Sequence, residues 1–262
     1  VGKAAGYGLT TGDANVAIGC NTLYNNNAGS CTAVGHSALG WASGANNTAV
    51  GANCAEAITT GAKNTVVGKS ALATLTTGNE NVAMGESAML NATTAYDSVS
   101  IGFEAGKALT TAHSNTIVGQ QAGLTITTGS DNVIIGDAAA SASGTDVDGC
   151  VIIGQAACLN CPGDNFVAIG YNALNAATTG SHSCTAVGYK ALYANTTGAN
   201  NTAVGFEAFK DLTTGNSNTA VGRQCAYNLT TGSDNAIFGY NAGDEITTGG
   251  NNTCVGALAG GG

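Results

Sequence analysis

The chain has 262 residues, a net charge of −9 and only seven Lys and Arg residues, which are scattered along its length. Because phosphate binding needs clustered basic side chains, this composition argues against a nucleic-acid partner. Although the chain contains 40 glycines, 44% of its residues are hydrophobic, so we expect an ordered, tightly packed structure rather than a disordered linker.

A motif of the form Asn-Thr-Ala-Val-Gly recurs along the chain, as at 201–205 and 218–222. Its glycine, called here the anchor glycine, is followed by the next one after 17 residues at most steps and after 16 or 18 at a few. Such self-similarity predicts a repeat architecture, and it continues over 1–262 as a single domain without a linker. The anchor glycines are Gly2, Gly19, Gly35, Gly51, Gly68, Gly85, Gly102, Gly119, Gly136, Gly154, Gly170, Gly188, Gly205, Gly222, Gly239 and Gly256.

The expected elements follow the same order in every repeat. A short strand precedes each anchor glycine, as at 15–18, 64–67 and 132–135, because these segments are β-branched and are bounded by Asn and Gly. A small residue, most often Ala, follows three positions after the anchor. Each repeat then turns at a Thr-Thr-Gly corner, where we expect glycine to supply a positive φ. These corners are at 10–12, 59–61, 76–78, 127–129, 178–180, 196–198, 213–215, 230–232 and 247–249.

A repeat of 17 residues is too short for a pair of helices. Two short strands and two tight turns in each repeat instead predict an all-β fold, a narrow parallel β-solenoid (β-roll) of about 15 coils. At a strand spacing of roughly 4.8 Å, such a stack would be on the order of 70 Å long.

The two residues before each anchor glycine are both apolar, as in Ala203-Val204 and Ala220-Val221. Because adjacent strand residues point to opposite faces, the sheet should be apolar on both sides. One side can fill the interior, and the other needs an outside partner. We therefore predict lateral self-association through one of the two columns, lined either by Val204 and Val221 or by Ala203 and Ala220. The simplest assembly is a parallel homotrimer, and head-to-tail stacking is the alternative, since no capping unit is apparent at either end.

Asparagine opens most of the predicted strands, which suggests a ladder of side chains hydrogen-bonded from coil to coil. Its expected members are Asn15, Asn47, Asn64, Asn81, Asn115, Asn132, Asn201, Asn218, Asn235 and Asn252.

The core Asn-Thr-Ala-Val-Gly-x-x-Ala-Leu resembles the head repeats of trimeric autotransporter adhesins of the YadA type. The longer unit CTAVGYKALYANTTG, at 184–198, is similar to repeats of phage tail-fibre proteins. The resemblance covers the whole chain and implies a left-handed parallel β-roll, side-by-side trimers and a role in attachment. The longer period and the Thr-Thr-Gly corner depart from the adhesin pattern. These families' repeats have no catalytic residues to carry over.

The nine cysteines fit best as small buried side chains. A disulfide is an alternative, joining Cys150 to Cys158 or Cys161, or Cys20 to Cys31. The CxxC spacing at 158–161 lacks the second pair that a zinc site needs.

Other polar and aromatic residues indicate no catalytic, cofactor or metal site. His36, His113 and His182 are expected in solvated turns. The acids at corners have no calcium-binding repeat around them; these are Asp13, Asp131, Asp146, Asp148, Asp164, Asp234, Asp244 and Glu245. Aromatic residues directly after the anchor glycine form a partial stripe that is either a contact surface or turn packing, at Phe103, Tyr171, Tyr189, Phe206 and Tyr240.

These observations together favour a structural protein without enzymatic activity or cofactor. We expect a self-assembling shaft or adhesin segment of an extracellular, cell-surface or virion filament, with a cell-surface glycan or another receptor as its partner. No run of about 18 apolar residues occurs, so membrane insertion is not expected. The alternative is an ice-binding β-solenoid that uses its Thr ladders, although such faces favour Thr-x-Thr over the Thr-Thr found here.

Overall fold

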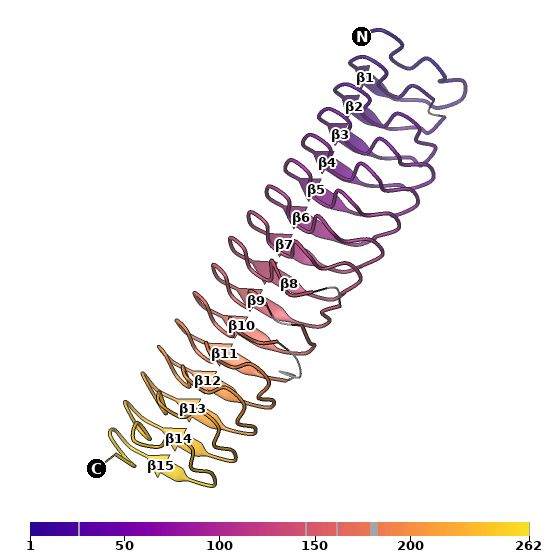
Figure 1. The fold of residues 1–262 in the computed structure, drawn as a ribbon. Coiled ribbons are helices and arrows are strands. Elements are labelled where there is room, and N and C mark those ends of the chain that lie inside the picture. The colour runs from indigo at the N-terminus through magenta and orange to yellow at the C-terminus, as the bar shows by residue number, and fades with distance from the viewer. Residues whose placement is uncertain (26, 145, 161, 179–182, 262) are drawn as a thin grey trace. The chain divides into compact units, whose positions relative to one another are not determined.

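The computed structural model describes residues 1–25, 27–144, 146–160, 162–178 and 183–261. The chain divides into two compact units, Val1–Asp131 and Asn132–Gly262, and each is described by itself. Both units are parallel β-solenoids with coils of about 17 residues, which confirms the predicted fold class (Figure 1). Among the described residues there is no helix long and apolar enough to cross a membrane.

Each strand is three residues long and pairs in parallel, in register, with the strand of the adjacent coil. In the second unit, for example, Thr202 pairs with Thr219 and Val204 with Val221. The strands of the first unit are β1 (Val16–Ile18), β2 (Thr32–Val34), β3 (Thr48–Val50), β4 (Thr65–Val67), β5 (Val82–Met84), β6 (Val99–Ile101) and β7 (Thr116–Val118). Those of the second unit are β8 (Val133–Ile135), β9 (Val151–Ile153), β10 (Val167–Ile169), β11 (Thr185–Val187), β12 (Thr202–Val204), β13 (Thr219–Val221), β14 (Ala236–Phe238) and β15 (Thr253–Val255).

The prediction of two strands per coil is wrong, because in the described residues each coil contributes one. The segment after the anchor glycine is a row of turns in which the second and fourth residues have positive φ, as in Ser70 (φ 56°) and Leu72 (φ 47°). Their N–H groups point in opposite directions along the stack: Ser70 donates to Ala52 O at 2.9 Å and Leu72 to Ala88 O at 3.0 Å. Bonds to both neighbouring coils hold a conformation that is strained for residues with a side chain.

The interior is filled by complementary side chains within each coil. Where the middle strand residue is isoleucine, the residue four after the anchor is small, as in Ile117 with Gly123. Where the middle residue is Ala203, the partner position holds Phe209, and both are fully buried. A Cβ built on Gly123 would lie 3.2 Å from Cδ1 of Ile117, so this glycine makes room for the isoleucine. This compensation keeps the narrow core densely packed in these coils.

Glycine is required at two corners for different reasons. The anchor glycines have φ near +138°, and a Cβ on Gly85 would lie 2.3 Å from Gly102 O in the next coil. The Thr-Thr-Gly glycines were expected to have positive φ, and this is wrong for Gly61, Gly78, Gly198, Gly215 and Gly232. They are needed because the next coil passes too close: a Cβ on Gly78 would lie 1.9 Å from Ala95 O. Thr179 and Gly180 of the corner at 178–180 lie outside the described residues.

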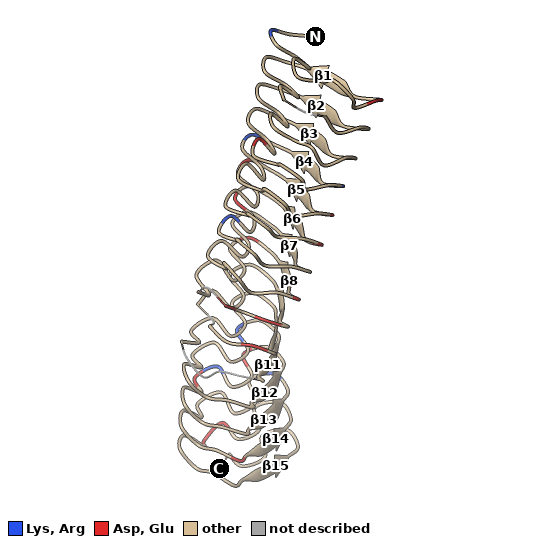
Figure 2. Cartoon of the chain, turned by 90° about the vertical axis from the view of Figure 1, so that its right-hand side faces the viewer, with Lys and Arg blue, Asp and Glu red and all other residues tan. Residues whose placement is uncertain are grey.

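The charged residues lie in the turns, and the strands contain none (Figure 2). Some of them pair from one coil to the next. Lys63 Nζ lies 2.6 Å from Glu80 Oε1, and Lys69 Nζ lies 2.9 Å from Glu86 Oε1. Both pairs are exposed to solvent, so each contributes little to stability.

Candidate functional site

The predicted asparagine side chains form buried ladders inside both units. Asn64 Nδ2 donates to Asn47 Oδ1 at 3.0 Å and to Gly78 O at 3.0 Å, and the Asn64 N–H donates to Asn47 Oδ1 at 2.9 Å. Asn81 repeats these bonds to Asn64. Each side-chain amide therefore accepts the backbone N–H of the next asparagine along the chain and donates to a carbonyl of that next coil, as buried polar groups require. In the second unit Asn201, Asn218, Asn235 and Asn252 are bonded in the same way.

Other residues continue the ladder where asparagine is absent. Ser98 takes the place of an asparagine, donating its N–H to Asn81 Oδ1, while Ser98 Oγ accepts from the Asn115 N–H at 3.3 Å. The Cys150 N–H donates to Asn132 Oδ1 at 3.0 Å. Cys184 Sγ donates to Gly198 O at 3.3 Å, the kind of carbonyl that the asparagine amides use elsewhere. Most members of the column are therefore small side chains that hydrogen-bond along the stack, and the exception is the buried Phe166.

The two columns predicted for self-association face opposite sides of the sheet. Ala203 and Ala220 are fully buried in the interior, so they cannot contact another chain, and the prediction that names them as interface residues is wrong. Val204 is half-buried and Val221 is 37% exposed, because the last residue of each strand points outward. This outer column, formed by the last strand residues, is apolar in both units, with Met84, Ile101, Ile135 and Phe238 among its exposed members.

An aromatic stripe runs beside the outer column in the second unit, one residue after each anchor glycine. The rings of Tyr171 and Tyr189 stack at 5.4 Å, and those of Tyr189 and Phe206 at 4.9 Å. Arg223 follows, its Cζ 5.6 Å from the Phe206 ring and 5.5 Å from the Tyr240 ring. The stripe thus continues over five coils, with one cation, Arg223, between the rings of Phe206 and Tyr240.

Sequence reasoning missed Arg223 because it considered only aromatic residues, although Arg223 occupies the same position after its anchor. Phe103 lies in the first unit and is not part of this stack. The stripe is both turn packing and exposed surface, since each ring stacks on a neighbouring coil while its edge remains accessible. Exposed rings next to an exposed apolar column form a continuous apolar strip on the second unit.

The threonines of the Thr-Thr-Gly corners use their hydroxyl groups within the fold. Thr59 Oγ1 donates to Thr76 O at 3.0 Å, and Thr76 Oγ1 donates to Thr93 O at 2.9 Å. In the second unit Thr213 Oγ1 donates to Thr230 O at 3.0 Å. The first threonine of each corner therefore ties its coil to the next one along the chain.

The cysteines and histidines form no reactive cluster in the described part of the chain. Cys20, Cys31 and Cys150 are free thiols, so the proposed pairs that include them are wrong. Cys158 is disulfide-bonded, and Cys161 lies outside the described residues, as does His182. His113 stacks on Tyr96 at 4.8 Å, and His36 Nδ1 lies 3.2 Å from Asn53 Oδ1. Within the described residues no group of three or more His, Cys, Asp or Glu side chains could hold a metal ion.

Burial makes several of these thiols poor nucleophiles. It raises the pKa of Cys54 to about 11, that of Cys225 to about 11 and that of Cys150 to about 12. A thiol reacts as the thiolate, so these groups stay protonated and inert at neutral pH.

No family model, curated protein or solved structure matches this chain.

Proposed function

We propose that this chain is a structural segment of a self-assembling filament, acting as the shaft or adhesin part of an extracellular, cell-surface or virion fibre. The observation that carries the proposal is the exposed apolar outer column, which recurs at every coil and, in the second unit, adjoins the aromatic stripe. A monomer rarely exposes so continuous an apolar strip without a partner. The motif resemblance to adhesin heads and tail-fibre repeats supports the same assignment.

The partner in this proposal is another copy of the chain, because a repeated apolar column is complementary to itself. Three chains placed side by side in parallel would each turn the outer column toward a common axis, which gives the closed symmetry of a homotrimer. The role in this proposal is structural, and the densely packed, hydrogen-bonded coils would supply its rigidity.

Sedimentation and light scattering at micromolar protein concentration test this proposal. We expect the unmodified chain to be oligomeric and the double variant V204K/V221K to dissociate, because a lysine in the outer column would place its charge in an apolar interface. The control is T214K/T231K, which adds the same charges at exposed corner positions and should remain oligomeric. A stable, dispersed monomer of the unmodified chain would overturn the proposal.

The ice-binding alternative has less support. Its Thr ladders would have to present free hydroxyl groups to water, whereas the first threonine of the corners donates its hydroxyl to a backbone carbonyl. A measurement of thermal hysteresis tests this alternative directly, and we expect none.

A further inference from the structure

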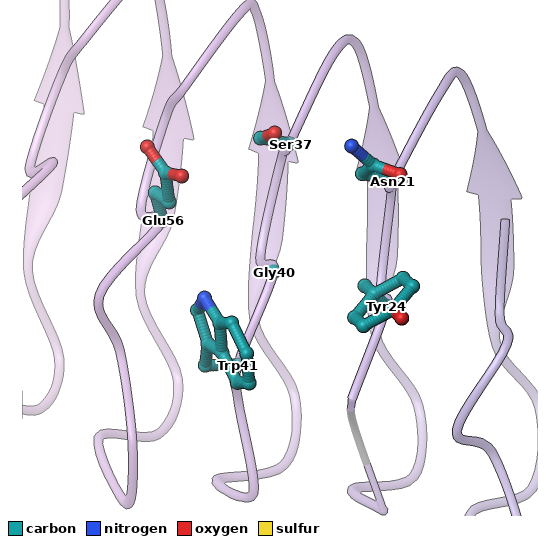
Figure 3. Close-up of a pocket in the computed structure, with 6 residues that line it drawn as sticks. All are labelled: Asn21, Tyr24, Ser37, Gly40, Trp41 and Glu56. Carbon is teal, nitrogen blue, oxygen red and sulfur yellow. The ribbon is translucent and has the colours of Figure 1, made fainter. Parts of the chain in front are cut away.

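A shallow groove of about 300 Å³ lies on the turns of the first unit (Figure 3). Its residues come from three successive coils. The rings of Tyr24 and Trp41 lie 6.1 Å apart at an angle of 67°, and the Trp41 side chain is 54% exposed. Asn21, Ser37 and Glu56 form a polar row beside these rings, as Figure 3 shows.

The groove exists because one side chain is missing from a column. Tyr24, Gly40 and Glu56 occupy the fifth position after their anchor glycines, so Gly40 leaves a gap between the other two. A Cβ built on Gly40 would meet no atom closer than 3.7 Å, and its φ is not positive. The backbone therefore does not require glycine here, in contrast to the anchor glycines. On the other side of Tyr24, Tyr7 stacks at 5.3 Å and supports the ring.

The polar groups of the groove are unused by the fold. In the described part of the chain, the side chains of Asn21, Ser37 and Glu56 have no hydrogen bond or ion pair to another residue. Other surface acids do have such partners: Gln121 Nε2 donates to Glu104 at 3.0 Å, and Gln224 Nε2 donates to Glu207 at 3.1 Å. Unpaired donors and acceptors grouped beside two exposed rings indicate a ligand that is polar at its edge and apolar on its face.

We propose that this groove binds a pyranose sugar, as a residue of a larger glycan. The C–H face of a pyranose is apolar and packs against the electron-rich face of an aromatic ring, which here is Trp41 or Tyr24. Its ring hydroxyls can donate to the Glu56 carboxylate and exchange hydrogen bonds with the Asn21 amide and the Ser37 hydroxyl.

Other ligand classes fit this groove less well. A purely apolar ligand would leave the Glu56 carboxylate desolvated without a donor. An anion would be repelled by Glu56. A quaternary ammonium ion would suit the rings and the carboxylate but would leave Asn21 and Ser37 without partners.

Sugar binding would supply the ligand for the proposed attachment role, so this inference rests on the proposed function. The two proposals can nevertheless be tested separately, because the groove lies in the first unit and the V204K/V221K substitutions lie in the second. An unmodified chain that is monomeric but still binds sugar would reject the filament alone. Assembly without sugar binding would reject the groove alone.

Trp41 is the only tryptophan in the chain, so its intrinsic fluorescence reports directly on the groove. The full chain would be titrated with the methyl glycosides of glucose, galactose, mannose and N-acetylglucosamine, and saturation-transfer NMR would detect contacts that fluorescence does not. We expect a saturable signal with at least one glycoside, with a Kd on the order of 1 mM, as suits a small ligand in a shallow groove.

Two matched variants place the binding in the groove. Gly40→Leu fills the gap with a side chain that the same column carries at Leu90 and Leu124, so the fold should tolerate it and affinity should fall about tenfold or more. Ala73→Leu makes a similar change one coil beyond Glu56 and should leave affinity unchanged. Absence of binding by both methods, equal binding by Gly40→Leu, or a response to tetramethylammonium but to no glycoside would overturn the proposal.

Discussion

Some glycines of this chain are required by the backbone and others are not, and the contacts around each glycine distinguish the two kinds. Gly85 lies where any side chain would collide with the carbonyl of Gly102, whereas a Cβ on Gly40 would make only ordinary van der Waals contacts. We expect Gly85→Ala to destabilise the fold by on the order of 3 kcal/mol, since backbone of the next coil must move and the φ is unfavourable for alanine. Gly40→Ala should be neutral or slightly stabilising. Denaturant melting of the two variants compares them, and equal losses would contradict this account of the anchor glycines.

We expect the buried thiols to make the stability of the fold decrease at alkaline pH. Burial raises the pKa of Cys54 and Cys225 from 9.0 to about 11, so the folded state holds these protons more tightly than the unfolded state. Their contribution to stability is therefore fully present below pH 9 and is lost as pH rises through about 11.

The variant C54A/C225A should lose less stability than the wild type between these pH values, because alanine occupies the same column in most other coils. All other side chains are common to both proteins, so the comparison isolates the two thiols. Identical alkaline melting curves for the two proteins would contradict the assignment.

At the scale of the element, the asparagine ladder links each strand to its neighbours. Asn64→Ala would remove the acceptor used by the N–H and the amide of Asn81 and leave Gly78 O without its donor. Each buried polar group left unpaired costs about 1–3 kcal/mol, so we expect a total loss of about 3–5 kcal/mol. Asn79→Ala is the control, because Asn79 is exposed and accepts one bond, from the Ala62 N–H. A loss from Asn64→Ala no larger than that from Asn79→Ala, in thermal or denaturant melting, would show that the ladder is not a main source of stability.

The strand and the ladder could be predicted from sequence, and the turn that follows could not. Val, Thr and Ile before the anchor have a clear β propensity, and the column of asparagines is visible by alignment. In contrast, Ser70 and Leu72 are not residue types that favour positive φ, so their sequence does not indicate the turns. Their positive φ values arise from hydrogen bonds to both neighbouring coils, which no local propensity records.

At the scale of the whole chain, periodicity predicts the fold but conceals the groove. A repeat is recognised by what its coils share, whereas the groove depends on how one coil differs, with Gly40 in a column that otherwise carries side chains such as Tyr24 and Glu56. The choice between the two candidate interface columns also needed the structure, since both are apolar and only the direction of the strand side chains separates Val204 from Ala203. Exceptions within a column are therefore the best sequence signal for function in such a chain.

The repeat also predicts how the chain tolerates deletion. Because each coil contacts its neighbours through equivalent positions, stability should be close to a sum over coils. Removal of residues 69–85, one complete coil of 17 residues, would join Gly68 to Glu86 and restore every column. At a typical stability per residue the loss should be about 1–3 kcal/mol, with the β-type circular dichroism and a cooperative melt retained. Removal of residues 69–77 is the control, because it deletes Thr76 and Thr77 of the corner at 76–78 and leaves only half a coil, residues 78–85, between Gly68 and Glu86. If both deletions destabilised the protein equally, the coils could not be independent units joined only by their neighbours.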